Sequence, residues 1–254
     1  MEKLKKELGQ NFLINQDDIN NFINFCDINN NDIVLEIGPG NGALTKHIAQ
    51  KAGKVIGIEL DTTLIPILNN LKIKNLKIKN CNFLDLNLRK LIEEEKITKI
   101  IGAIPYYITS PIIHKIVEES YTPLLKVCLI TQKEFAQKVI GTNKKEHPSR
   151  SYFTNLIEKY ATINAGKTIV KNSFNPAPKV NSMFFGFTFK NYPKNILEVK
   201  NWEKFLHVVF KNPRKKINKA FRANILTTHN INSDLRPSNL TLESIIALYK
   251  EYYK

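Results

Sequence analysis

A glycine-rich loop, EIGPGNGALT (36–45), has the spacing of a site that holds a ribose or a phosphate. Gly38, Gly40 and Gly42 let the backbone turn tightly and approach a ligand, and the helix expected after them presents free N–H groups. Glu59 ends the next apolar run, where ribose-binding sites of this kind place an acid. GPGNGA also fits the dinucleotide pattern G-x-G-x-x-G/A, so the loop leaves both a nicotinamide cofactor and S-adenosylmethionine open.

The stretch IPYY (104–107) has residue types that suit the transfer of a methyl group to a planar amine. Such an amine needs acceptors for its hydrogens, so that its lone pair points at the methyl group, and a flat surface for its ring. A backbone carbonyl near Pro105 can accept one hydrogen. Tyr106 can stack on a base, an interaction worth roughly 1–3 kcal/mol. This chemistry favours S-adenosylmethionine as the ligand of the glycine loop.

Five short runs rich in β-branched apolar residues predict the strands that must position these groups. Segments with helical spacing, such as ALTKHIAQKAG, separate them. The alternation predicts an α/β fold with a mostly parallel sheet, helices on both faces and ligands at the carboxyl ends of the strands. The expected strands are 32–38, 54–60, 76–80, 98–104 and 125–131.

The second half of the chain has a different pattern. Residues 143–150 read as a polar connector, residues 170–190 are strand-like around FNPAPKV, and helical spacing begins at Asn201. We therefore expect a Rossmann-like methyltransferase domain over 1–190 and a small helical domain over 191–254.

The positive charge of the chain lies in its second half. The net charge is +15, yet residues 1–132 hold 16 Lys and Arg against 15 Asp and Glu, whereas residues 133–254 hold 22 against 8. A basic field of this kind attracts polyanions, and nucleic acid is their commonest form. A lysine-rich genome is the alternative, but such a bias should not respect a boundary.

The segment FKNPRKKINKAFRAN (210–224) is the expected local source of RNA contacts. On a helix beginning near Pro213, the basic residues would share or flank one face while Ile217, Ala220 and Phe221 face inward. A solvated lysine face is the alternative. Phosphate contacts here would position an RNA without reading its sequence. The basic residues are Arg214, Lys215, Lys216, Lys219 and Arg222.

The remaining composition bounds the class of protein. Cys26, Cys81 and Cys128 lie far apart, which predicts neither a disulfide framework nor a zinc site, and the histidines show no metal-ligand spacing. The N-terminus has no signal-peptide pattern, and no run approaches the roughly 18 apolar residues of a spanning helix. We expect a cytoplasmic, monomeric protein without a metal.

Six stretches, in their order along the chain, resemble the ribosomal RNA adenine dimethyltransferases of the KsgA/RsmA type. The resemblance covers almost the whole chain, and IPYY is similar to the (N/D)-(I/L/P)-P-Y motif of N6-adenine methyltransferases. Erythromycin-resistance methyltransferases share most of the first half, but the last stretch favours the small-subunit group. The stretches are LGQNFLIN (8–15), EIGPGNGALT (36–45), IPYYITSPII (104–113), TQKEFAQKVI (131–140), FNPAPKVNS (174–182) and RPSNLTLESIIALY (236–249).

The resemblance implies S-adenosylmethionine as the cofactor. Asn11 and Leu13 match residues that contact it, and Gly38 matches the loop glycine beneath it, with Gly40 in the same loop. Glu59 would accept hydrogen bonds from the ribose hydroxyls. The family places an Asp at position 82 to receive the adenine amino group. Asn82 keeps an oxygen acceptor without the charge, so weaker cofactor binding is expected.

The resemblance also implies the residues around the reacting amine. Phe174 matches an aromatic that packs on the target base opposite Tyr106, although a plain core position is the alternative. Ala103 stands where the family has an Asn that accepts one hydrogen of the amine and lies near the methionine portion of the cofactor. Pro105 and Tyr106 keep the family pattern. Losing a transition-state hydrogen bond of this kind can cost on the order of 10²–10³ in rate.

The implied function is dimethylation of the N6 amines of two adjacent adenosines in a small-subunit ribosomal RNA hairpin loop, as a step of ribosome biogenesis. The implied partner is that RNA or its precursor particle. Ala103 leaves three possibilities: an inactivating change, a water or backbone group in place of the acceptor, or an RNA-binding assembly factor without methylation. A nicotinamide dehydrogenase would leave IPYY and the basic second half unexplained.

Overall fold

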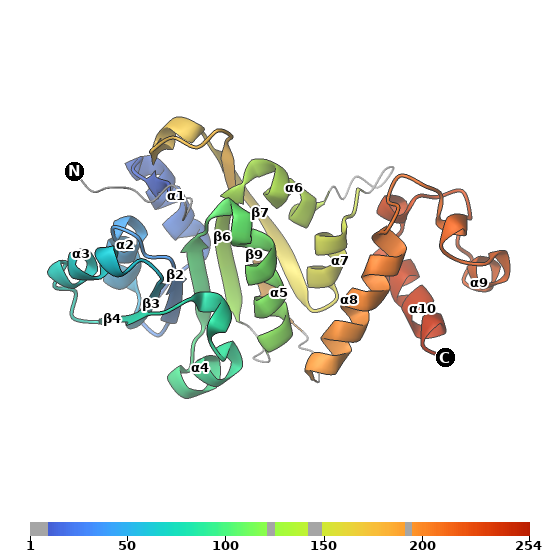
Figure 1. Cartoon of the computed structure of the whole chain (residues 1–254), viewed down its shortest axis with the longest axis horizontal. Helices are drawn as coiled ribbons and strands as arrows, with labels where there is room; N and C mark the ends of the chain where they lie inside the picture. Colours follow the sequence, from blue (N-terminus) through green and yellow to red (C-terminus); the bar gives the residue numbers. More distant parts are fainter. Residues whose placement is uncertain (1–9, 121–124, 142–148, 191–194) are drawn as a thin grey trace.

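A seven-stranded sheet forms the centre of the computed structural model, which describes residues 10–120, 125–141, 149–190 and 195–254. Within these ranges the strand order is β4-β3-β2-β5-β6-β9-β7 (Figure 1). The strands are β2 (Ile33–Ile37), β3 (Lys54–Glu59), β4 (Leu76–Asn80), β5 (Lys99–Ala103), β6 (Lys126–Gln132), β7 (Ala161–Ile169) and β9 (Ser182–Phe189).

The first five of these strands are parallel and match the five apolar runs, so this part of the predicted α/β fold is confirmed. Strands β9 and β7 are antiparallel to their neighbours and extend the sheet past β6. The inner parallel strands are buried on both faces, which is why they read as continuous apolar runs and not as alternating ones. In β2, for example, Val34 and Leu35 point to opposite faces and both are fully buried.

Helices cover the two faces of the sheet and form two apolar clusters. Phe22 and Ile48, from α1 and α2, belong to the cluster on one face, while Leu88 and Ile113, from α4 and α5, belong to the cluster on the other. The helices of this part are α1 (Gln16–Cys26), α2 (Ala43–Lys51), α3 (Ile65–Asn70), α4 (Leu88–Glu95), α5 (Thr109–Glu119), α6 (Lys133–Ile140) and α7 (Tyr152–Glu158).

The chain changes direction across the sheet at β2. Strands β3 and β4 lie on one side of β2, and β5 and β6 lie on the other. At such a switch point the loops after the neighbouring strands diverge, and a crevice opens at the carboxyl ends. The glycine loop follows β2 and IPYY follows β5, so the topology brings both motifs to this crevice.

A small two-stranded sheet borders the crevice. Strand β1 (Phe12–Leu13) pairs with β8 (Phe174–Asn175), and Leu13 lies opposite Phe174. The N–H of Ile14 donates to the carbonyl of Ser173 at 2.8 Å. The strand-like region expected over 170–190 is therefore split into β8 and β9, with residues 176–181 outside any strand.

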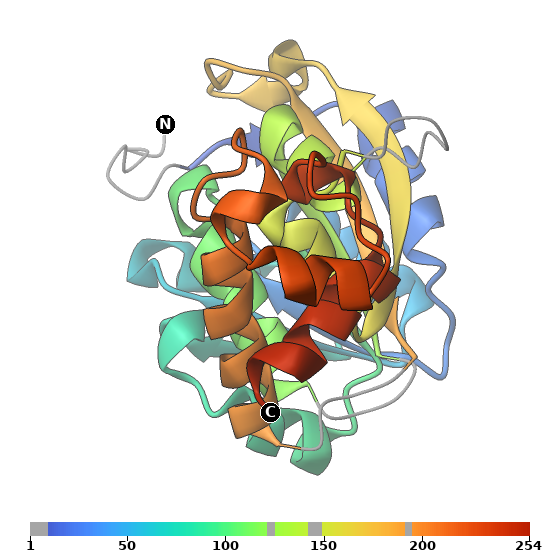
Figure 2. The same ribbon diagram turned by 90° about the vertical axis from the view of Figure 1, so that its right-hand side faces the viewer.

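Three helices form the C-terminal end of the molecule, α8 (Ile196–Phe210), α9 (Ala223–Thr228) and α10 (Leu242–Tyr252) (Figure 2). Helix α8 begins five residues before the expected start at Asn201, because the Asn195 side chain caps it by accepting the N–H of Glu198 at 3.0 Å. None of the described helices combines the length and the apolar character needed to cross a membrane.

The C-terminal helices share an apolar cluster with the sheet. Trp202 and Leu206 of α8 are fully buried, in one cluster with Phe187 of β9 and Ile116 of α5. The Trp202 indole N–H donates to the carbonyl of Asn155 at 3.2 Å. The expected division of the chain after residue 190 borders on residues 191–194, and these lie outside the described residues, as does most of the expected connector at 143–150.

This shared cluster predicts that the two parts unfold together. In urea, the fluorescence of Trp202 and the far-ultraviolet circular dichroism should give one common midpoint. Leu206→Ala should lower the urea midpoints of both transitions together. The substitution leaves a cavity, which costs about 2–5 kcal/mol in the free energy of unfolding. The exposed Lys204→Ala is the matched control. Two separate midpoints would show that the C-terminal helices unfold on their own.

Candidate functional site

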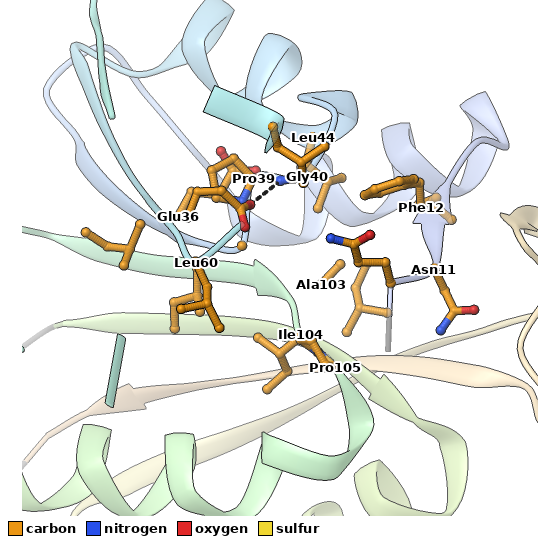
Figure 3. Close-up of a pocket in the computed structure, with 18 of the residues that line it drawn as sticks. Asn11, Phe12, Glu36, Pro39, Gly40, Leu44, Leu60, Ala103, Ile104 and Pro105 are labelled. Atoms are coloured by element: carbon orange, nitrogen blue, oxygen red, sulfur yellow. Dashed lines mark hydrogen bonds between the residues drawn. The ribbon is translucent and has the colours of Figure 1, made fainter. Parts of the chain in front are cut away.

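A pocket lies at the carboxyl ends of β2, β3 and β5, where the topology places the switch point (Figure 3). In this view Glu36 and Leu60 are on one side of it, Asn11 and Phe12 are on the other, and Ala103 lies between. The structure brings every residue predicted for the cofactor and the target base to this one pocket. They are Asn11, Leu13, Gly38, Gly40, Glu59, Asn82, Ala103, Pro105, Tyr106 and Phe174.

The glycine loop needs glycine for two different reasons. Gly38 and Gly40 have φ values of +66° and +61°, which side chains rarely adopt. A Cβ on Gly38 would meet nothing within 4 Å, so this backbone borders open space that a ligand can enter. A Cβ on Gly40 would lie 2.7 Å from Cε1 of Phe12, so Gly40 lets the N-terminal segment pack against the loop.

Glu59 fastens the loop to the end of β3. One carboxylate oxygen accepts the N–H of Gly40 at 2.9 Å, and the other accepts the N–H of Asp61 at 2.8 Å. Burial raises the pKa of Glu59, and these two hydrogen bonds partly oppose the rise. Each carboxylate oxygen has a second lone pair, so the side chain can still accept from ribose hydroxyls.

Glu36 is a second buried carboxyl in the pocket, and the sequence reasoning above did not single it out. The residue is 1% exposed, and its Oε2 atom has no hydrogen-bond partner. Burial raises its pKa to about 8, the Thr45 hydroxyl opposes this, and the charge of Glu59 adds to it. Its place two residues before Gly38 is visible in the sequence. The burial that raises its pKa is not visible there.

Asn82 lies at the edge of the pocket and caps a short 3₁₀ helix, η3 (Phe83–Asp85). Its Oδ1 atom accepts the N–H of Leu84 at 3.1 Å, which leaves one lone pair for a ligand. Asp85, the acidic residue three positions after Asn82, is exposed and is not among the described residues that line the pocket. Asn82 therefore lines the same pocket as the other residues predicted to bind the cofactor.

The corner after β5 holds Tyr106 in a fixed orientation. A 3₁₀ helix, η4 (Tyr106–Ile108), follows Pro105, and the Tyr106 hydroxyl makes a 2.7 Å hydrogen bond with Oγ of Ser182. Ser182 is fully buried on β9, 76 residues away in sequence. Burial raises the pKa of Tyr106, so its hydroxyl stays protonated near neutral pH. The carbonyl of Pro105 accepts the Ile108 N–H and the Thr109 hydroxyl, each at 3.3 Å, so local donors already engage both of its lone pairs.

Two aromatic residues beside this corner differ in exposure. Phe174 is 6% exposed and lines the pocket from β8, so it belongs both to the apolar core and to the pocket wall. Tyr107 is 58% exposed and also lines the pocket. Tyr107 had no predicted role, and it gives the mouth of the pocket an open aromatic ring.

The pocket suits a cationic ligand. Among the described residues that line it, the charged side chains are Glu36 and Glu59, and none is basic. A buried carboxyl with a vacant oxygen favours a ligand that brings positive charge or hydrogen-bond donors. S-Adenosylmethionine carries a sulfonium, an ammonium group and ribose hydroxyls, so the residues present fit this group.

The basic segment after α8 lies apart from this pocket and is not the expected helix. Pro213 disfavours helical backbone at the residue before it, Asn212. Helix α8 therefore ends at Phe210, and turns follow. The regular structure that follows is a short 3₁₀ helix, η6 (Ile217–Lys219). The N–H of Ile217 donates to the carbonyl of Leu235 at 2.7 Å, so contacts across the C-terminal region set this conformation.

The five basic residues predicted to contact RNA are all exposed, so their accessibility agrees with the prediction. Ile217 and Phe221 are buried as expected, whereas Ala220 is exposed, contrary to the prediction. A hollow in this segment gathers four lysines, Lys211, Lys215, Lys216 and Lys219. Arg214 and Arg222 are exposed but are not among its described lining residues, and Lys216 pairs with Asp234 at 2.8 Å.

Among the residues that the structure describes, the cysteines and the possible metal ligands form no second centre. Cys26, Cys81 and Cys128 are free thiols, and burial raises the pKa of Cys26 well above its ordinary value. In the described part of the chain, no three His, Cys, Asp or Glu side chains gather as a metal ion would require.

Comparison with known proteins gives the family. The model of the ribosomal RNA adenine dimethylase family matches residues 1–254. "Ribosomal RNA small subunit methyltransferase A" of Mycoplasma mycoides is 36% identical over 99% of this chain and 98% of its own length, and that of Fusobacterium nucleatum is 34% identical over 98% and 97%.

Solved structures show the same fold. A dimethyladenosine transferase from Plasmodium falciparum has a TM-score of 0.77 at 23% identity and covers 95% of this chain and 97% of its own. The 23S rRNA methyltransferase ErmE has a TM-score of 0.71 at 21% identity, over 96% and 100%. The match of the family model to the whole sequence, with relatives 34–36% identical over nearly its full length, places this chain in the ribosomal RNA adenine dimethylase family.

Proposed function

We propose that this protein transfers methyl groups from S-adenosylmethionine to the N6 amines of two adjacent adenosines in a hairpin loop of small-subunit ribosomal RNA. It would act as a monomer in the cytoplasm on a precursor of the small subunit. The observation that carries the proposal is the pocket itself. Residues from the N-terminal segment, the glycine loop, β3, the IPYY corner and β8 converge there, in a chain of this family.

The cofactor side of the pocket is built by the glycine loop and the carboxylates. S-Adenosylmethionine, when bound, supplies a methyl group on a sulfonium sulfur. Glu59 would hold the ribose hydroxyls, while Asn11, Leu13, Gly38 and Asn82 line the rest of the same cavity. These residues would fix the position of the methyl group, and proximity and orientation are the main source of rate in a direct transfer.

The acceptor side is built by the corner after β5. Tyr106, held by Ser182, offers a ring face on which an extruded adenine can stack, and Phe174 offers a second apolar wall. A backbone carbonyl at the corner would accept one hydrogen of the amine, which turns the nitrogen lone pair toward the methyl group. After transfer the amine releases one proton to solvent, so the product is neutral.

The RNA would be positioned from the C-terminal region. Exposed lysines and arginines after α8 suit contacts with phosphates, which orient a nucleic acid without reading its bases. An adenine must leave its stack to enter the pocket, and a loop of single-stranded RNA makes this least costly.

The hydrogen bond between Tyr106 and Ser182 predicts different effects for two substitutions. Tyr106→Ala should lower kcat/KM by roughly 5- to 150-fold, the equivalent of a lost base stack of 1–3 kcal/mol. Tyr106→Phe keeps the ring and should lose less. The assay is transfer of labelled methyl groups to small subunits that lack the modification, with cofactor affinity measured separately. Equal losses for the two variants would contradict a stacking role.

Ala103 predicts a gain of activity on substitution. Ala103→Asn restores the side-chain acceptor of the family pattern and should raise the methyl-transfer rate by up to the order of 10²–10³. Ala103→Leu, which adds bulk without an acceptor, is the control. If the wild-type protein and Ala103→Asn both bind S-adenosylmethionine and subunits but neither incorporates label, the chain acts as an assembly factor and not as a methyltransferase.

The exposed lysines after α8 predict a change in the salt dependence of RNA binding. Lys215→Ala with Lys219→Ala should weaken binding and reduce the slope of log K against log salt by about 1.5, because two phosphate contacts are lost. Lys74→Ala with Lys90→Ala removes the same charge elsewhere and should leave the slope nearly unchanged. If both pairs of substitutions reduced the slope of log K against log salt equally, the effect would come from net charge alone and not from phosphate contacts of Lys215 and Lys219.

A further inference from the structure

The pocket carries negative charge in a strongly basic chain. The net charge of the protein is +15, yet the charged side chains among the described lining residues are the two carboxyls, Glu36 and Glu59. Both belong to neighbouring parallel strands, since Glu36 lies opposite Gly57 of β3 and Glu59 ends that strand. A buried pair of carboxyls is costly when both are charged, so the surroundings decide which of them carries the proton.

The surroundings favour the charge on Glu59. Its two oxygens accept the N–H groups of Gly40 and Asp61, at 2.9 Å and 2.8 Å. Asp61 is a third buried carboxyl nearby, and it is bonded by the side-chain amide of Gln10 at 2.8 Å. Backbone donors stabilise the charged form of a carboxylate and partly oppose the rise that burial causes in the pKa of Glu59, so of the pair Glu59 is the better supported as an anion.

The surroundings of Glu36 offer much less. Strand β5 presents Ile101 opposite it, β3 presents Glu59, and α2 presents the hydroxyl of Thr45. Its Oε2 atom and the Oγ1 atom of Thr45 are both buried without a hydrogen-bond partner. A pKa of about 8, caused first by burial, means that Glu36 is mostly protonated near neutral pH when no ligand is bound.

We propose that Glu36 is a proton-linked binding residue: entry of a cationic ligand into the pocket drives the proton from its carboxyl to solvent and leaves a carboxylate paired with the ligand. The inference rests on the proposed function, because it takes S-adenosylmethionine as the cation. No covalent bond forms or breaks other than the O–H bond of Glu36, and one proton leaves for each ligand bound.

The direction of the pH dependence follows from this linkage. Below pH 8 the neutral carboxyl must be ionised before it can pair, so affinity falls as the pH falls. If the ionised form alone binds, affinity should rise about 50-fold between pH 6 and pH 8, and level off above. Glu36→Gln cannot ionise and should lack this rise. The cofactor has an amino group that titrates in the same range, so the quantity to compare is the ratio of the two affinities.

Calorimetry counts the proton directly. Titrating the full chain with S-adenosylmethionine in two buffers of different ionisation enthalpy gives the number of protons released, without any need for activity. Wild type should release about 0.9 more protons than Glu36→Gln at pH 7, and about 0.1 more at pH 9. Contributions from the amino group of the cofactor are common to both proteins and cancel in this difference.

The failures of the two proposals are distinguishable. Absence of binding heat in the wild-type protein would contradict S-adenosylmethionine as the cofactor. Binding with equal proton release in wild type and Glu36→Gln would overturn the role of Glu36 alone. If the variant does not fold, infrared difference spectra of the wild-type protein decide the question. A protonated carboxyl band should disappear when the ligand is added at pH 7, and an unchanged band would refute the proposal.

Discussion

The parallel pairing of β2 with β3 on one side and β5 on the other is the constraint on which the site depends. Because the chain crosses over in opposite directions from β2, the loops after these three strands separate at their carboxyl ends. The glycine loop, Glu59 and Ala103 end or follow those strands, so one backbone topology brings together groups up to 67 positions apart in the chain. The hydrogen bond from Gly40 to Glu59 then fixes the loop against β3.

The antiparallel part of the chain completes what the parallel sheet begins. Strand β9 places Ser182 beside Tyr106, and β8 places Phe174 beside Leu13. Each of these contacts joins residues more than 70 positions apart. The acceptor side of the pocket therefore depends on the correct register of β9 against β6, where Ser182 lies opposite Gln132. A shift by one residue would turn the Ser182 hydroxyl away from Tyr106.

The sequence was sufficient for the inner strands of the parallel sheet, since strands buried on both faces must be continuous apolar runs and these are visible locally. It was insufficient where distant contacts override a local pattern. The charges of 214–222 repeat like a helical face, yet Pro213 and the hydrogen bond of Ile217 with Leu235 impose turns. Glu36 shows the same limit, because an acidic residue before glycines is visible in the sequence, but its burial beside Glu59 arises only from the folded sheet.

The distribution of charge separates the two ligands that the proposed reaction needs. The charged side chains of the pocket at the carboxyl ends of β2, β3 and β5 are acidic, so it favours a cation, whereas the exposed lysines after α8 favour a polyanion. A phosphate backbone gains nothing from approaching two buried carboxyls, and a lone base carries no such penalty. The RNA would therefore lie along the basic region while a single base enters beside Tyr106. Ala103, at the end of β5, lines the pocket and not the basic hollow, so in the proposed reaction its missing acceptor would affect the transfer step and not the binding of RNA phosphates.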